Sequence, residues 1–440
     1  MNVDVELDNK KRRSDGLALV SIRISDLDAS KELDISFSGL YERCRIPNPI
    51  CLDLLIVASI CYAIDKSVPR SMSLDSWTRE FEVEIPVSSP TRWNAAAKEL
   101  MPALRFLTGD NWNLSFKQLT DDLFVEPVRG PRQKPRPEKL ADITAICSLS
   151  GGVDSLAGAI NLLENDPTSQ IHFIGHYDGS GTKAPQKSIF PKLQLAYPGR
   201  TEFTQVRIQQ RPNKSQEMTL RSRSFLFAAI QVFAAQAIDN HIPIHMPENG
   251  FIALNLPLTP SRVGSCSTRT MHPYYLNKLQ RGLRELGIRN SILNMFEFKT
   301  KGECVSACSN RNLIESAVID SVSCSHGSRK QNWTRKGRHV RNCGYCVPCI
   351  IRRASMNKIE RDNSLNYGID ILSDEIAENG NSASANDLRA IRSFVGKSWT
   401  IENVTREINR VASVSDVNKR ANMILRGVEE IKALLESKLR

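Results

Sequence analysis

The chain has 440 residues, 41% of them apolar, which is enough for two or three domains with hydrophobic cores. Its longest apolar stretch (54–64) is too short to span a bilayer, and the charged first fifteen residues lack the apolar segment of a signal peptide. We therefore expect a cytoplasmic protein with no membrane partner. The net charge of +11 favours anionic partners, and eleven cysteines in a reducing compartment indicate metal binding or free thiols.

Residues 1–128 carry no catalytic motif. Period-two alternation predicts strands at 33–37, 81–87 and 112–116. Helical periodicity predicts one helix at 95–107. We therefore predict an N-terminal α+β accessory domain over 1–128. The basic, proline-rich stretch 129–140 has no apolar periodicity and predicts a solvated linker, with a nucleic-acid-binding arm as the alternative.

The next domain, predicted over 141–358, opens on a strand, a glycine-rich loop and a helix. The apolar run 143–149 predicts a buried strand, and the helix is indicated by Leu156, Ile160 and Leu163. Between them lies the loop, formed by Ser150, Gly151, Gly152, Val153, Asp154 and Ser155. Glycines admit a ligand close to the backbone, and the free N–H groups of a helix start favour an anion.

The polar side chains of this loop add to the prediction of a phosphate site. Ser150 and Ser155 offer hydroxyl donors, and Asp154 could hold Mg²⁺. The lysine of a Walker loop is absent, so the loop predicts a different kind of phosphate cradle. The alternative is an ordinary Gly-Gly turn followed by a Ser/Asp helix cap.

The following stretches predict a parallel sheet, in which ligands bind beyond the carboxyl ends of the strands. A second strand over 171–177 leads to Asp178, and a third over 242–246 leads to Glu248 and Asn249. These three residues are our candidates for substrate binding. The helix predicted over 220–240 begins with Arg221 and Arg223, which are suited to a phosphate or carboxylate, and a last strand is predicted near 292–298.

Two histidine pairs have a spacing that could bind metal on a helix, namely His172 with His176 and His241 with His245. Both pairs fall on predicted strands, where four residues span about 13 Å. One ion cannot bridge that distance, so we interpret these histidines as structural.

Four cysteines predict a closed zinc site. Cys343, Cys346 and Cys349 have C-x2-C-x2-C spacing, and Cys324 precedes them by nineteen positions. Four thiolates leave no open coordination position, so the zinc would be structural. An iron–sulfur cluster is the alternative. We interpret Cys304 and Cys308, which have no clear partners, as buried thiols.

A basic window coincides with the cysteines. Between Asp320 and Glu360 there is no acidic residue, and nine of the residues are lysine or arginine. A nucleic-acid footprint is one interpretation. We instead predict that the window, including Arg335, Lys336 and Arg338, serves the anionic zinc and nucleotide sites, which makes nucleic acid an unlikely partner. After it, residues 359–440 predict a C-terminal helical extension.

The loop resembles the pyrophosphate loop of the ATP pyrophosphatase (PP-loop) superfamily. Together with the four cysteines and the Ile-Ile-Arg-Arg at 350–353, it resembles 7-cyano-7-deazaguanine synthase, the QueC family. The family's T-K-x-E segment is matched by Thr300, Lys301 and Glu303, and its mid-domain arginine by Arg223. The resemblance covers about half of the chain. The extensions at both ends make the architecture similar to QatC, the QueC-like component of the Qat anti-phage defence system.

The resemblance implies an α/β fold of the adenine nucleotide alpha hydrolase type, a parallel sheet with helices on both faces. It also implies ATP, Mg²⁺ and structural Zn²⁺, adenylation of 7-carboxy-7-deazaguanine with release of pyrophosphate, and transfer to an amine to give an amide or nitrile. Asp154 and Ser155 would act at the phosphates, and Arg223 and Lys301 would hold the substrate carboxylate or the α-phosphate.

In the defence system the amine could belong to a partner protein of the same operon. Val153, where the family usually has glutamine or a similar residue, and the long, basic gap before Cys343 depart from the family pattern. Two other functions remain open. One is a PP-loop enzyme that modifies tRNA, and the other is a non-catalytic nucleotide sensor.

Overall fold

The computed structural model describes residues 1–27, 29–44, 47–127, 139–212, 217, 221–259, 269–326, 340–373 and 382–437. The strands are β1 (Asn2–Arg12), β2 (Ala18–Ile24), β3 (Ala29–Ile35), β4 (Glu80–Val87), β5 (Asn111–Gln118), β6 (Ala145–Ser148), β7 (Ile171–Tyr177), β8 (Thr201–Arg211), β9 (Ile244–His245) and β10 (Ile292–Leu293). The helices before β9 are α1 (Ser38–Cys44), α2 (Pro49–Ser67), α3 (Pro90–Thr108), α4 (Val153–Asn165), α5 (Ser180–Ala196) and α6 (Arg223–Gln236). Those after it are α7 (Gly250–Leu254), α8 (Pro273–Glu285), α9 (Lys301–Ser306), α10 (Arg311–Ala317), α11 (Val347–Asn357), α12 (Ala383–Val395), α13 (Ile401–Val411) and α14 (Val417–Glu436).

The described strands form one ten-stranded sheet in the order β10-β9-β6-β7-β8-β3-β2-β1-β4-β5. The half from β10 to β8 is parallel throughout, as predicted for the region of the glycine-rich loop. β3 pairs antiparallel with β8, with Ile35 opposite Ile208. The sheet therefore continues from the N-terminal region into the region after the predicted linker, whose residues 128–138 lie outside the described ranges.

Helices cover both faces of the parallel half, and alternate residues of each strand meet opposite layers. Ile146 and Ile174 belong to a core shared with α6, whereas Cys147 and Phe173 belong to a core shared with α4 and α5. This period-two separation follows from the pleat of a strand. The fold is thus α/β, and the first of the two cores also includes α2 and α3 of the N-terminal region.

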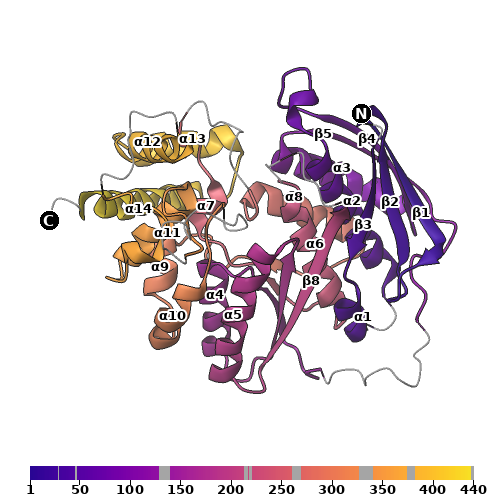
Figure 1. Ribbon diagram of the computed structural model, residues 1–440, viewed down its shortest axis with the longest axis horizontal. Helices are drawn as coiled ribbons and strands as arrows, with labels where there is room; N and C mark the ends of the chain where they lie inside the picture. The colour runs from indigo at the N-terminus through magenta and orange to yellow at the C-terminus, as the bar shows by residue number, and fades with distance from the viewer. Residues whose placement is uncertain are drawn as a thin grey trace.

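The C-terminal helices form a separate layer at the end of the molecule opposite the N-terminal strands (Figure 1). α12, α13 and α14 share a third apolar core with α7 and α11, built around residues such as Phe394, Ile424 and Ile431. Among the described helices, none is long and apolar enough to cross a bilayer.

Several predicted elements differ from the structure in their bounds, among them the strand predicted over 242–246, of which β9 forms two residues. The strand predicted near 292–298 ends at Leu293, because the Asn294 side chain accepts a hydrogen bond from Phe296 N and so forms a turn. The helix predicted over 95–107 starts earlier, at Pro90, and continues through Pro102. The helix predicted over 220–240 is shorter, because α6 spans Arg223–Gln236.

Candidate functional site

The glycine-rich loop follows β6, which lies between β7 and β9 in the sheet. From β6 the chain builds β7 and β8 on one side and then returns to place β9 and β10 on the other. Such a reversal leaves a crevice at the carboxyl ends of the strands, the usual ligand site of open α/β sheets. The loop after β6, Asn249 after β9 and Asp178 after β7 all lie at this edge.

Hydrogen bonds within the loop fix its shape. Gly151 has φ +84°, a conformation that favours glycine. Ser150 Oγ accepts from Gly152 N at 3.3 Å and donates to Ser155 Oγ at 3.1 Å, and Ser155 Oγ donates to Gly152 O at 3.0 Å. The two predicted hydroxyl donors are therefore engaged inside the loop, and a ligand would have to reorient them.

The start of α4 remains available to an anion. Gly152 is the N-cap residue and offers no side chain to cap the helix. Within the described residues, no acceptor lies at the backbone N–H groups of Val153, Asp154 and Ser155. These N–H groups carry the positive end of the helix dipole, which suits a phosphate.

Asp154 lies at the centre of the site and is held by two other predicted residues. Its Oδ1 atom accepts from Lys301 Nζ at 2.7 Å, and its Oδ2 atom accepts from Asn249 Nδ2 at 2.8 Å. All three side chains are buried. The structure thus brings together residues from the ends of β6 and β9 and from the start of α9, and Asn249 and Lys301 lie 95 and 147 positions from Asp154 in the chain.

Local capping positions both partners of Asp154. The Asn249 Oδ1 atom caps α7 by accepting from Ile252 N at 3.1 Å, which leaves the Nδ2 group for Asp154. Lys301 is the first residue of α9, and Thr300 and Glu303 form a capping box around it. The Thr-Lys-Gly-Glu segment therefore has a clear structural reason for its residue types.

Glu248 adds a second carboxyl group beside Asp154. Its Oε2 atom accepts from Met271 N at 3.2 Å, and Asn294 bonds both its backbone N–H and its backbone carbonyl. Burial, and after it the negative charge of Asp154, raises the pKa of Glu248 to about 8, against the opposing charge of Lys301. At neutral pH this carboxyl group is therefore mostly protonated.

Carboxylate oxygens are the ligands that Mg²⁺ prefers in proteins, so Asp154 and Glu248 fit a magnesium ion chemically. The fit is conditional, because Lys301 and Asn249 already bind the two oxygens of Asp154. A cation between the two carboxyl groups would remove the repulsion that contributes to the raised pKa of Glu248.

Asp178 and Arg223 form a second group at the same sheet edge. Arg223 Nη2 lies 4.0 Å from Asp178 Oδ1, while Tyr62 Oη donates to Asp178 Oδ2 at 2.6 Å and Lys66 Nζ lies 3.4 Å from the same atom. Burial acts to raise the pKa of Asp178, but the charge of Arg223, the Tyr62 hydroxyl and the charge of Lys66 outweigh it. The net pKa lies well below its usual range, so Asp178 is ionised.

Tyr62 and Lys66 come from α2, and the sequence analysis did not identify them. Nothing in the pattern of a buried helix distinguishes a residue that contacts the carboxyl end of a distant strand. His172 and His176 of β7 are buried and bond Thr204 Oγ1 and Ile208 O, in line with a structural role.

The four predicted cysteine ligands converge. The Sγ atoms of Cys343 and Cys349 lie 3.8 Å apart, and those of Cys346 and Cys324 lie 3.9 Å apart. Sulfur ligands at about 2.3 Å from a tetrahedral zinc ion are separated by about 3.8 Å. The spacing therefore fits zinc, and the backbone N–H groups of Cys343 and Cys346 bond two of the sulfurs, as expected for a metal knuckle.

A histidine that the sequence analysis missed lies at the same cluster. One candidate donor atom from each of Cys324, His326, Cys343 and Cys346 lies within 4.8 Å of those of the other three. The C-x-H spacing of Cys324 and His326 is a signal that could have identified it. The cluster also lies beside the loop, because Val322 N donates to Gly151 O at 2.8 Å, two residues before Cys324.

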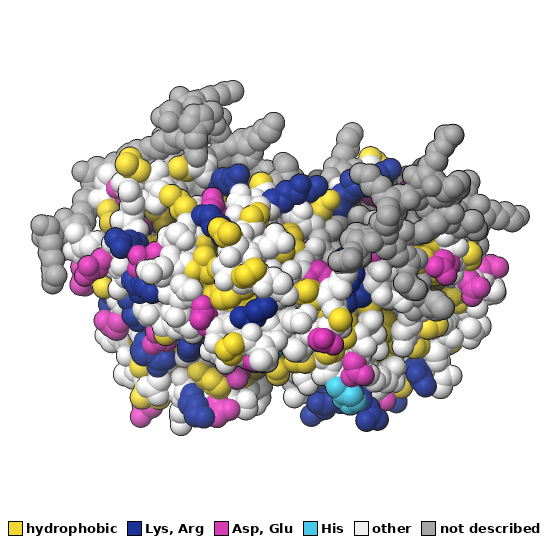
Figure 2. Space-filling view, turned by 90° about the horizontal axis from the view of Figure 1, so that it is seen from below, with side chains coloured by type: hydrophobic (Ala, Val, Ile, Leu, Met, Phe, Trp, Pro, Cys, Tyr) yellow, Lys and Arg dark blue, Asp and Glu magenta, His cyan; other side chains and the backbone are white. Residues whose placement is uncertain are grey.

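Three arginine and lysine residues of the basic window are used inside the protein. Arg353 is buried and pairs with Asp362 and Asp370, Arg352 donates to Ser321 Oγ and Val318 O, and Lys358 pairs with Glu430. Arg329, Lys330, Arg335, Lys336 and Arg338 lie outside the described residues. On the face drawn in Figure 2, basic and acidic side chains are interspersed rather than gathered by sign.

No protein-family model, no curated protein and no solved structure matches the chain.

Proposed function

We propose that this chain is an ATP-dependent enzyme that activates a carboxylate by adenylation and releases pyrophosphate. The observation that carries the proposal is the Asp154–Lys301–Asn249 cluster beside an uncapped helix start, at the point where the strand order of the sheet reverses. An anion-binding loop at that point is a common place for nucleotide phosphates.

In this proposal the substrate carboxylate attacks the α-phosphorus of ATP, and the bond from that phosphorus to the β-phosphate oxygen breaks. The backbone N–H groups of Val153, Asp154 and Ser155 stabilise the charge that gathers on the departing pyrophosphate. Lys301, held by Asp154, supplies a fixed positive charge at the α-phosphate. A magnesium ion would add charge neutralisation at the phosphates when bound.

The proposed substrate is 7-carboxy-7-deazaguanine, which rests on the resemblance of the loop and the cysteine motif to the QueC family. The adenylate would then react with an amine, either ammonia or an amine of a partner protein, with AMP as the leaving group. The extra N- and C-terminal regions support the second acceptor and a role in anti-phage defence, as in the QatC-like architecture. In this reading the zinc is structural, because four cysteine thiolates would fill its coordination sphere.

Pyrophosphate release tests the proposal. Wild-type protein with ATP, Mg²⁺, 7-carboxy-7-deazaguanine and an amine, either ammonia or a candidate partner protein, should release pyrophosphate, and mass spectrometry should identify the AMP and the amide, nitrile or protein conjugate. Asp154→Asn, which keeps the side-chain shape, should lower the rate by about 10²-fold or more. Asp166→Asn, at the other end of α4, is the matched control and should leave the rate unchanged.

The remaining outcomes distinguish the alternatives. Binding of ATP without pyrophosphate release, whatever carboxylate is supplied, would contradict the enzyme and favour a nucleotide sensor. Pyrophosphate release that requires tRNA and not the deazaguanine would favour a tRNA-modifying enzyme.

A further inference from the structure

The carboxylate of Asp178 is bound on one side and open on the other. Its Oδ2 atom accepts a hydrogen bond from Tyr62 and lies at 3.4 Å from Lys66. Its Oδ1 atom faces Arg223 at 4.0 Å, which is too long for a hydrogen bond, and no donor among the described residues bonds it. The exposed fractions of the Asp178 and Arg223 side chains are 17% and 26%, so solvent reaches both.

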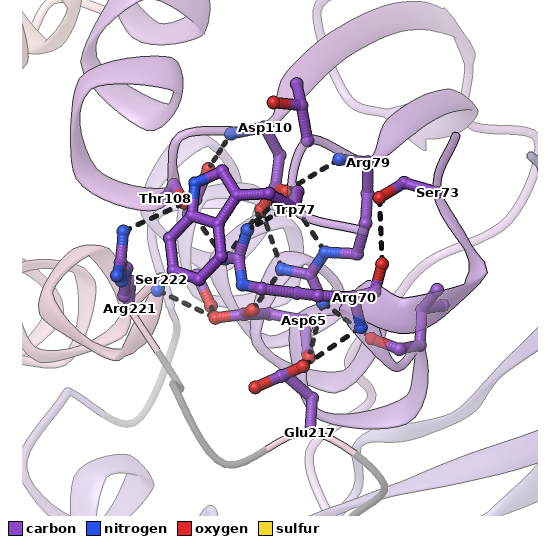
Figure 3. Close-up of polar contacts among 12 residues, drawn as sticks. Asp65, Arg70, Ser73, Trp77, Arg79, Thr108, Asp110, Glu217, Arg221 and Ser222 are labelled. Carbon is purple, nitrogen blue, oxygen red and sulfur yellow. Dashed lines mark hydrogen bonds and ion pairs between the residues drawn. The ribbon is translucent and has the colours of Figure 1, made fainter. Parts of the chain in front are cut away.

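Helix α2 also determines where Arg223 lies. Asp65 Oδ2 accepts from Ser222 N at 2.9 Å and from Ser222 Oγ at 2.7 Å, immediately before α6 begins. The other oxygen of Asp65 pairs with the buried Arg79 at 2.6 Å. Figure 3 shows this network, in which Asp110 binds Arg79 and Arg70 as well. The end of α2 and the start of α6 are therefore fixed to each other.

The charges at this place leave an ionised acceptor beside an unsatisfied donor. The low pKa of Asp178 keeps it negative, while burial, with help from the charge of Arg223, lowers the pKa of His176 to about 3 and keeps that ring neutral. The Arg223 Nε atom has no acceptor within the described residues but is itself buried, so a ligand would meet the partly exposed guanidinium at its Nη groups. Lys66 and Arg223 together carry two positive charges, whereas Asp178 carries one negative charge.

A ligand that fits such an edge presents an N–H group next to an acceptor oxygen. Asp178 Oδ1 would accept from the N–H group, and the Arg223 guanidinium would donate to the oxygen, as in the paired contacts that side chains make with base edges. A cyclic amide in a heterocycle has these two groups on adjacent ring atoms.

We propose that α2 completes a subsite for a cyclic-amide edge, in which Asp178 and Arg223 contact the ligand and Tyr62 and Lys66 are positioning residues. This inference rests on the proposed function, because it assigns the part of the substrate that is not adenylated. It also gives Arg223, which lies beside Asp178, to that part instead of to the carboxylate or α-phosphate expected from the resemblance. It makes the N-terminal region a component of the substrate site, since half of the four side chains belong to α2.

Equilibrium binding to the full chain tests the subsite without turnover. The probes are 7-carboxy-7-deazaguanine and its 6-O-methyl derivative, which lacks both the ring N–H group and the carbonyl oxygen. Calorimetry should show the first binding about tenfold or more tightly to wild type. Asp178→Asn should remove this preference, and Tyr62→Phe and Lys66→Met should each weaken binding of the first probe about three- to tenfold.

The matched control is Tyr41→Phe, which removes another N-terminal tyrosine hydroxyl, bonded to Glu126 at 2.9 Å, and should change nothing. ATP affinity should be unchanged in every variant. Equal binding of the two probes to wild type, binding of neither, or wild-type affinities in both α2 variants would overturn the subsite. Pyrophosphate release, measured separately, would then still decide the proposed function.

Discussion

At the scale of single residues, the site is dominated by a buried charge pair. Lys301 and Asp154 have little exposure to solvent, and they lie at 2.7 Å in an environment where neither charge is hydrated well. A buried pair of this kind contributes little net stability, but loss of one partner leaves an uncompensated buried charge. The pair is thus better explained by its position at the helix start than by a need for stability.

The first prediction is a double-mutant cycle on this pair. Asp154→Asn and Lys301→Met should each lower the free energy of unfolding by about 2–4 kcal/mol, and the double variant should lose less than the sum. Urea denaturation measures all four proteins. Lys299→Met, two residues before Lys301, is the control and should cost less than about 1 kcal/mol. Additive losses would contradict a direct coupling.

Glu248 is the titratable group from which a pH dependence can be derived. Its pKa is raised to about 8 in the folded protein, whereas an unfolded glutamate titrates near 4.5. Between these values the unfolded chain binds fewer protons than the folded one. Stability should therefore decrease as pH rises from about 4.5 to 8, and this contribution should level off above pH 8.

The second prediction follows from that sign. Glu248→Gln removes the titrating group but keeps the shape of the side chain, so it should reduce the loss of stability between pH 5 and pH 8.5 by about 1–3 kcal/mol. Denaturant midpoints at several pH values for wild type and variant measure the difference. The same pH slope in both proteins would contradict the raised pKa.

At the scale of elements, the C-terminal helix α14 is attached to the start of α9. Glu430 accepts from Thr300 Oγ1 at 2.5 Å, from Gly302 N at 3.2 Å and from Lys358 Nζ at 2.7 Å. A carboxylate at a helix N-terminus satisfies free N–H groups and is favoured by the helix dipole. The C-terminal extension thus fixes the turn that carries Lys301.

The third prediction is that Glu430→Gln lowers the free energy of unfolding by about 1–2 kcal/mol, because it removes charge-assisted hydrogen bonds. Its neighbour Glu429 is exposed and pairs with Lys432 on the helix surface. Glu429→Gln is therefore the matched control and should change stability by less than about 0.5 kcal/mol. Equal effects in thermal or urea unfolding would show that the carboxylate contributes through general charge alone.

The cysteine cluster also depends on a long-range contact. Cys324 lies well before the other three cysteines, which form a knuckle at the start of α11. Its sulfur distances match a tetrahedral zinc site. With the four cysteines, His326 makes five candidate ligands for the four coordination positions of the ion. The spacing of the three knuckle cysteines favours Cys349 over His326 as the fourth ligand.

The fourth prediction is one zinc ion per chain, measured by elemental analysis. Cys346→Ser and Cys349→Ser should lose most of the zinc and lower the melting temperature, because metal binding is coupled to local folding. His326→Ala should retain zinc, and Cys308→Ser, a buried thiol outside the cluster, is the control. Iron in the purified protein, or full zinc content in Cys349→Ser, would contradict this ligand set.

At the scale of the whole molecule, the N-terminal region is joined to the parallel half by more than a linker. β3 pairs with β8, and one apolar core contains residues of β2, α2, α3 and α6. The buried network of Asp65, Arg79 and Asp110 crosses the same boundary through Ser222 (Figure 3). Buried charges of this kind tolerate no partial opening, because each partner left alone would be uncompensated.

The fifth prediction is that these two regions unfold together. Denaturation followed by far-ultraviolet circular dichroism and by tryptophan fluorescence of a variant that carries both Trp333→Phe and Trp399→Phe should give coincident transitions. Trp77, Trp93 and Trp112 report on the N-terminal region, whereas circular dichroism reports on every helix and strand. An earlier fluorescence transition would indicate an N-terminal region that unfolds independently.

Features encoded by local patterns could be predicted from the sequence. The strand, loop and helix around Ser150–Ser155, the parallel arrangement of β6 and β7, and the cysteine knuckle all follow from residues close in the chain. β8 was missed although its residues alternate in burial, because the polar Thr204 and Gln210 occupy buried positions and Phe203 a half-buried one, which weakens the hydrophobic contrast.

The sequence by itself determined which residue types could do chemistry, because strand periodicity, glycine conformation and cysteine spacing act over a few residues. It did not determine that Lys301 and Asn249 share the carboxylate of Asp154, that α2 supplies Tyr62 and Lys66 to Asp178, or that β3 extends the parallel half of the sheet. Those contacts join residues 95 to 179 positions apart. Only the packing of the whole chain brings such residues together, because no local propensity favours one distant partner over another.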